Sequence, residues 1–154
     1  MLEKNYASRE LIFVASLMFI LLLAQGRAEY VGGTASALTS GSGGSIELSD
    51  QRYLGFYTKR GQVRVAYERV NLLEYGQKVD RRLLAAVVIS PMFLLSKSRK
   101  HFLTIGYMDE DGKQQALIFR VDKGSIRSAL VSLEARTGLK VQYQDEEARK
   151  AGKG

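Results

Sequence analysis

The sequence contains no cysteine and no tryptophan, and it has one histidine and one proline among its 154 residues. Without cysteine the protein forms no disulfide, has no thiol nucleophile and offers no thiolate ligand to a metal. A single histidine leaves little for a zinc site or for a histidine-based proton relay. These absences exclude disulfide scaffolds and thiol chemistry, and they point away from zinc enzymes and from histidine-based relays.

What is present fits one globular domain with a modest core. Hydrophobic residues make up 45% of the chain and charged residues 25%, and domains cluster near ~100–150 residues. The formal net charge is +7, but this charge is concentrated. Residues 79–101 contain five basic residues and one acidic residue, a local charge of +4. One basic region in a nearly neutral domain argues against nucleic acid as the partner.

An apolar segment lies near the start of the chain. Residues 11–24 read LIFVASLMFILLLA, with Ser16 as the only polar residue. This segment is shorter than the ~20 residues of a typical spanning helix. Gly26 and Ala28 are small residues of the kind that signal peptidase requires, so residues 1–28 are predicted to be a signal peptide cleaved after Ala28 or an uncleaved N-terminal anchor. Both interpretations predict that the rest of the chain is exported, to the periplasm or outside the cell.

A stretch rich in glycine and serine follows. Residues 32–45 read GGTASALTSGSGGS, and such a composition buries too little apolar surface to offset its ordering entropy. It contains no nucleophile elbow, dinucleotide-binding turn or P-loop. Residues 29–44 are therefore predicted to be a flexible linker.

Residues 45–145 are predicted to form the folded domain, mostly as antiparallel sheet. Short runs of β-branched and aromatic residues, separated by turn residues, predict strands at 46–48, 53–57, 63–65, 70–75, 102–108 and 115–121. The last two strands form the clearest pair, because the connection between them contains Asp111-Gly112, a sequence typical of tight hairpins.

The periodicity then changes from that of a strand to that of a helix. Ile126, Ala129, Leu130 and Leu133 have the i, i+3, i+4, i+7 spacing of one apolar helical face. Ser125 is predicted to cap the start of this helix and Gly138 to end it. Residues 139–143 are predicted to add a short strand or to pack under the helix end, and residues 146–154 to form a charged, frayed tail.

This order of elements resembles pleckstrin-homology-like (PH-like) domains. The segments QVRVAYERVNLLEYGQKVDRR, KHFLTIGYMDEDGKQQALIFRV and IRSALVSLEARTG are similar to those of a class of small bacterial PH-like (GRAM-like) proteins of uncharacterised function. The resemblance implies an α+β, mostly β fold: an antiparallel roll or barrel of short strands closed by one C-terminal helix. It also implies a binding platform, although Lys59, Arg60 and Arg64 do not match the lipid-binding signature of eukaryotic members.

A second resemblance is limited to one short segment. IRSALVSLEARTGLKVQY is similar to the helix-then-strand segment of secretin and TonB-receptor N-terminal domains. It implies an alternative function as a soluble periplasmic protein-interaction module.

The middle of the chain carries the candidate contact site. Residues 83–95 read LLAAVVISPMFLL, and Pro91 disfavours one continuous helix. One interpretation is a core element covered on both faces; the other is an apolar projection into one leaflet, with its basic flanks at the lipid phosphates. The candidate membrane-contact residues are Arg81, Arg82, Val88, Met92, Phe93, Leu94, Leu95, Lys97, Arg99 and Lys100.

No catalytic constellation emerges from the sequence. His101 follows Lys100 and leads into a predicted strand, with no evident serine or aspartate partner. Asp109, Glu110 and Asp111 lack the spacing of a calcium loop and are explained by turn chemistry. We therefore expect no catalytic residue, metal or cofactor. The prediction is an exported, non-catalytic binding or scaffolding domain whose partner is membrane lipid or a protein, with no nucleic acid and no small-molecule substrate.

Overall fold

The computed structural model describes residues 25–77, 88–89 and 100–153. Within these residues, nine strands form one mainly antiparallel sheet, and three helical elements accompany it. The strands are β1 (Gln25–Gly33), β2 (Ser42–Glu47), β3 (Tyr53–Thr58), β4 (Gln62–Ala66), β5 (Val70–Gly76), β6 (Val88–Ile89), β7 (His101–Met108), β8 (Gln114–Val121) and β9 (Gln142–Tyr143). The helical elements are the short 3-10 helix η1 (Tyr67–Arg69) and the α-helices α4 (Lys123–Thr137) and α5 (Glu146–Lys153).

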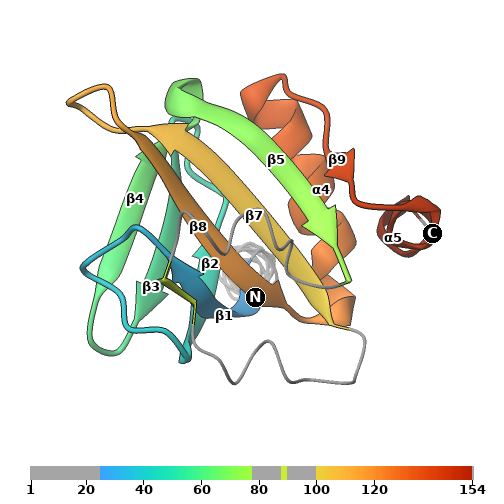
Figure 1. Ribbon diagram of the computed structural model, residues 1–154, viewed down its shortest axis with the longest axis horizontal. Coiled ribbons are helices and arrows are strands. Elements are labelled where there is room, and N and C mark those ends of the chain that lie inside the picture. The colour runs from blue at the N-terminus through green and yellow to red at the C-terminus, as the bar shows by residue number, and fades with distance from the viewer. Residues whose placement is uncertain (1–24, 78–87, 90–99, 154) are drawn as a thin grey trace, which may run out of the picture.

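Strand β1 joins the two halves of the sheet. The order is β4-β3-β2-β1-β8-β7-β5-β9, and β6 pairs with the end of β1. Because β1 pairs with β2 along its first six residues and with β8 from Ala28 onward, one strand belongs to both halves (Figure 1). The predicted mostly β fold is confirmed. The sheet does not close, since among the described strands β4 and β9 are the ends of the order and do not pair with each other, so the predicted barrel is wrong.

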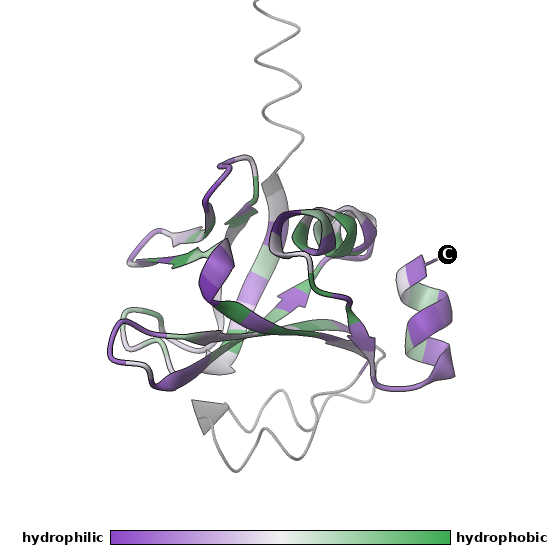
Figure 2. Ribbon diagram, turned by 90° about the horizontal axis from the view of Figure 1, so that it is seen from above, coloured by the Kyte–Doolittle hydropathy of each residue, from purple (hydrophilic) through white to green (hydrophobic). Residues whose placement is uncertain are grey.

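Helix α4 covers one face of this bent sheet, and in Figure 2 it is seen nearly end-on. Its buried residues are the four predicted from the spacing: Ile126, Ala129, Leu130 and Leu133. Gly138 ends the helix in the left-handed conformation, with φ 72°, which glycine adopts without steric cost. The N-cap is Asp122 rather than the predicted Ser125. The helix thus begins directly after β8, without an intervening loop.

The segment predicted to be a linker is part of the sheet. Residues 25–33 form the joining strand, and Tyr30 and Val31 are only 2% and 0% exposed. The ring of Tyr30 packs edge-on against Phe119, with ring centroids 6.0 Å apart. Residues 42–47 form β2. The prediction of a flexible linker over 29–44 is therefore corrected, and the described part of the folded domain includes residues 25–44, ahead of the predicted start at residue 45.

The C-terminal residues also differ from the predicted frayed tail. Residues 146–153 form α5, and Oδ1 of Asp145 accepts a hydrogen bond from the backbone N–H of Ala148 across 2.6 Å at its start. Ala148 is fully buried, and a Cβ added to Gly152 would lie 2.6 Å from the ring of Tyr143. Small residues at positions 148 and 152 therefore let the helix pack closely on β9. The predicted short strand after α4 is confirmed as β9.

The face of the sheet opposite α4 is also apolar and buried. Successive side chains of a strand point to opposite faces of the sheet. In β7 and β8, the side chains that belong to the core under α4 are those of Leu103, Ile105, Leu117 and Phe119. The side chains between them point to the other face. On that other face, which we call the outer face, four side chains are buried: Val31, Phe102, Thr104 and Ile118. The backbone of β6 pairs with Gly33 and Gly32 at the end of β1.

Candidate functional site

Most of the predicted membrane-contact residues lie outside the described part of the chain. These are Arg81, Arg82, Met92, Phe93, Leu94, Leu95, Lys97 and Arg99. Of the remaining two, Val88 belongs to β6, whose backbone pairs with β1. Lys100 immediately precedes β7 and is half-buried.

A groove runs between α4 and the neighbouring ends of β1 and β2. Its volume is about 260 Å³. The lining residues combine an apolar floor with hydroxyl groups and one cation; they are Gly26, Ile46, Leu48, Ser49, Val121, Ser125, Ser128, Ala129, Ser132 and Arg136. Three serines at i, i+3 and i+7 face the groove from one side of α4.

The width of the groove depends on Gly26. A Cβ added at this position would lie 3.3 Å from Cβ of Ser125, so a larger residue would push β1 away from the helix. Ser128 is already engaged locally, since its hydroxyl donates to the Ser125 carbonyl across 2.9 Å. The wall that α4 contributes to the groove is therefore polar, and the space between α4 and β1 is narrow.

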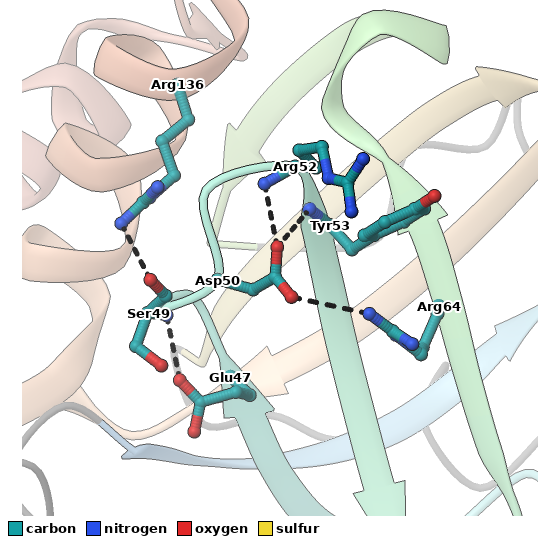
Figure 3. A network of polar contacts seen from close by, with 7 residues as sticks. All are labelled: Glu47, Ser49, Asp50, Arg52, Tyr53, Arg64 and Arg136. Carbon is teal, nitrogen blue, oxygen red and sulfur yellow. Dashed lines mark hydrogen bonds and ion pairs between the residues drawn. The ribbon is translucent and has the colours of Figure 1, made fainter.

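Arg136 connects the end of α4 to the β2–β3 turn (Figure 3). Its Nη2 donates to the carbonyl of Ser49 across 3.3 Å. Within the turn, Oδ1 of Asp50 accepts from the backbone N–H groups of Arg52 and Tyr53, at 2.7 Å and 3.1 Å. These backbone hydrogen bonds hold the pKa of the Asp50 carboxyl below its usual value. The turn is thereby fixed against the helix end.

The guanidinium of Arg136 also lies over the ring of Tyr67, 5.6 Å from its centroid. Tyr67 is 4% exposed, and its hydroxyl has no hydrogen-bond partner among the residues that the structure describes. Burial raises the pKa of Tyr67 to about 12. This side chain therefore stays neutral and serves as packing between η1 and α4.

A second hollow, of about 280 Å³, lies beside β4. Its walls come from η1 and the β7–β8 hairpin, and they include the side chains of Tyr53, Tyr107 and Met108. The guanidinium of Arg64 lies over the Tyr53 ring at 4.5 Å and pairs with Asp50 at 3.3 Å. Arg64, noted in the sequence as part of a basic hairpin, is thus held on the protein surface by a ring and a carboxylate.

His101 has a structural partner. Its Nδ1 is 2.5 Å from the hydroxyl of Tyr75, and the two rings are stacked with their centroids 5.9 Å apart. Burial lowers the pKa of His101, and the nearby charges of Lys123 and Arg127 lower it further. Tyr75 is fully buried. This arrangement matches a histidine that packs against a core tyrosine.

The acidic hairpin residues shape the turn. Oδ1 of Asp109 accepts from the backbone N–H groups of Asp111 and Lys113, at 3.0 Å and 2.8 Å, and Gly112 has φ 73°. Across residues 25–77, 88–89 and 100–153, no group of three histidine, cysteine or acidic side chains could hold a metal.

Four basic residues from different elements lie at one end of the sheet. Arg27 lies in β1, Lys100 precedes β7, and Lys123 and Arg127 lie in the first two turns of α4. The backbone N–H of Asp122 donates to the carbonyl of Arg27 across 3.2 Å, and His101 pairs with Val121 in the sheet. We call Arg27, Lys100, Lys123 and Arg127 the basic end. Only Lys100 was singled out from the sequence, because Arg27 is separated from Lys123 and Arg127 by about a hundred residues.

Comparison with models of known protein families and with curated protein sequences finds no match to this chain. In the part of the chain that the structure describes, no helix has the length and apolar character needed to cross a bilayer.

Proposed function

We propose that this protein is an exported, non-catalytic binding or scaffolding module with a PH-like fold, held at a membrane by its N-terminal apolar segment. The PH-like assignment is supported by a bent antiparallel sheet whose last long strand leads directly into a covering helix. A binding role is supported by the groove beside α4, which combines an apolar floor with hydroxyl groups and Arg136.

The observation that carries the membrane attachment is the start of β1 at Gln25, one residue after the apolar segment 11–24. Cleavage after Ala28 would remove four residues that pair with Glu47, Ile46, Ser45 and Gly44 in β2. Removing them would leave most of β2 without its inner partner. The geometry therefore favours retention of the N-terminal segment over cleavage at residue 28.

The outer face of the sheet is buried in the folded chain. Val31, Phe102 and Ile118 are buried there, and each gains about 1.5–3 kcal/mol from burial. Apart from β6, residues 83–95 lie outside the described part of the chain, so the proposed attachment rests on the N-terminal segment.

Vesicle flotation of the full-length chain tests the attachment. The wild-type chain is expected to float with neutral phosphatidylcholine vesicles, and the double variant Phe19→Asp, Leu22→Asp is expected to remain in the dense fraction, because a charge in an apolar segment opposes insertion. Asn5→Asp, Ser8→Asp is the matched control, since it adds the same charge outside the apolar segment. Equal flotation of the two double variants, or no flotation of the wild-type chain, would exclude the proposal.

A further inference from the structure

We propose that the basic end, formed by Arg27, Lys100, Lys123 and Arg127, is the surface with which the tethered domain docks on an anionic lipid bilayer. This inference rests on the proposed attachment and adds to it an orientation and a lipid class. The argument depends on where the four cations lie relative to the start of β1.

The residues of the basic end lie at the same end of the sheet although they are distant in sequence. The hydrogen bond from Asp122 N–H to Arg27 carbonyl joins the start of β1 to the start of α4. Val121 pairs with both Ala28 and His101, which brings β7 and Lys100 to the same end. Lys123 and Arg127 are close enough to lower the pKa of His101.

The charge at this end is mainly positive. Arg27, Lys123 and Arg127 are exposed, and the first turn of α4 contains no acidic residue. Among the described residues, none of the four cations forms a salt bridge. The acids nearest to these cations in the sequence are Asp122, which directly precedes Lys123, and Glu29, which pairs with Arg120, so positive charge predominates.

The position of this end relative to the apolar segment specifies the partner. The segment 11–24 joins β1 at Gln25, two residues before Arg27. Insertion of this segment in a bilayer would place Arg27 at the lipid headgroups. Asp122, whose N–H donates to the Arg27 carbonyl, and the start of α4 would then lie beside the headgroups as well. The opposite end of β1, at Gly33, is about 20 Å from Arg27 at ~3.3 Å per residue. A surface of positive charge held beside lipid phosphates matches an anionic leaflet.

The opposite end of the sheet provides an internal comparison. Lys59, Arg60 and Lys113 lie in the β3–β4 and β7–β8 turns, where they are exposed and accompanied by Glu110 and Asp111. They carry the same number of charges as Arg27, Lys123 and Arg127 together. Replacing these three residues therefore measures how much positive charge elsewhere on the surface contributes to docking.

The test uses single-cysteine labels, which the cysteine-free chain accepts without background. Gly124→Cys lies at the basic end, where an added Cβ meets nothing within 4 Å, and Ser36→Cys lies in the exposed loop after β1. Each full-length variant carries a fluorophore and is incorporated into vesicles that contain a headgroup nitroxide quencher. Vesicles contain either phosphatidylcholine alone or phosphatidylcholine with phosphatidylglycerol.

We expect the label at position 124 to be quenched severalfold more than the label at position 36 in anionic vesicles, and this difference to disappear in 1 M salt. Each cation near an anionic surface contributes about 1 kcal/mol, or about fivefold in the docked population. Arg27→Gln, Lys123→Gln, Arg127→Gln should therefore lower the docked-to-undocked ratio about a hundredfold. The control variant Lys59→Gln, Arg60→Gln, Lys113→Gln should change it little.

Equal quenching of the two labels on vesicle-bound chain would overturn the docking surface while leaving the attachment intact. Equal effects of the two triple variants would also overturn the docking surface. Failure of the labelled chain to associate with any vesicle would overturn the attachment as well. If a triple variant does not fold, docking is still tested, because the dependence of quenching on lipid and salt is measured with the two single-label proteins.

Discussion

The backbone N–H of Asp122 donates a hydrogen bond to the carbonyl of Arg27 across 3.2 Å. This bond links the first residues of the central strand to the first residues of the covering helix. Because β1 follows directly on the apolar segment, the bond also links the proposed membrane attachment to α4 and to the groove beside it. The proposed attachment and the groove are therefore joined through β1 and α4, which are neighbouring elements of the fold.

Two glycines in the segment predicted to be a linker distinguish a strand from a flexible tether. Gly33 has φ 145°, and an added Cβ would lie 2.2 Å from the Ala116 carbonyl oxygen; Gly43 has nothing within 4 Å. Gly33→Ala is expected to lower the free energy of unfolding by about 2–5 kcal/mol. Gly43→Ala is expected to change it by less than about 1 kcal/mol. Urea denaturation of both variants checks this, and equal effects would indicate a flexible segment.

The joining role of β1 predicts a large effect at Tyr30. Because its ring is buried against Phe119, Tyr30→Ala should destabilise the domain by about 3–5 kcal/mol. Ser36→Ala, in the exposed loop that follows, should cost less than about 0.5 kcal/mol. Thermal unfolding gives both values. A mild effect at Tyr30 would mean that β1 contributes little to the core.

The outer face can be tested at Ile118, which is fully buried although it lies opposite the α4 core. Ile118→Ala should cost about 2–5 kcal/mol. Val131→Ala on the exposed side of α4, where the side chain is 66% exposed, is the control and should cost less than about 0.5 kcal/mol. If Ile118→Ala proved as mild as the control in urea denaturation, the outer face would be open to solvent.

His101 makes stability depend on pH in the mildly acidic range. Its folded-state pKa lies below the ordinary value of 6.5, so the unfolded chain binds the proton more tightly. Stability contributed by neutral His101 is therefore present above about pH 6.5 and is lost as the pH falls through the lowered pKa. His101→Gln should remove this part of the decline as the pH falls below about 6.5 in thermal melts. An unchanged pH profile would show that folding does not shift the pKa of His101.

The sequence predicted elements whose patterns are local. The strands at 102–108 and 115–121 and the helix ending at Gly138 follow from alternation, helical spacing and capping. β1 was missed because residues 25–28 were assigned to the signal segment and residues 29–33 to the linker rich in glycine and serine, whereas the burial of this strand comes from partners on both sides. Of those partners, β2 and β8, the second lies some ninety residues away along the chain.

The candidate surfaces were predictable only in part, for a similar reason. The groove needs Gly26 beside Ser125, and the basic end needs Arg27 beside Lys123. No short window of sequence contains either pair. Helix α5 was missed because its buried face consists of Ala148 and Gly152, which are too small to produce an apolar pattern.

Intact-mass measurement of the protein purified from membranes of exporting cells tests the central claim most directly. We predict the mass of the full-length chain, because residues 25–28 complete the pairing of β1 with β2 and the segment before them is the proposed anchor. A mature protein that lacks this segment, whether it begins at Gln25 or at Glu29, would contradict the account.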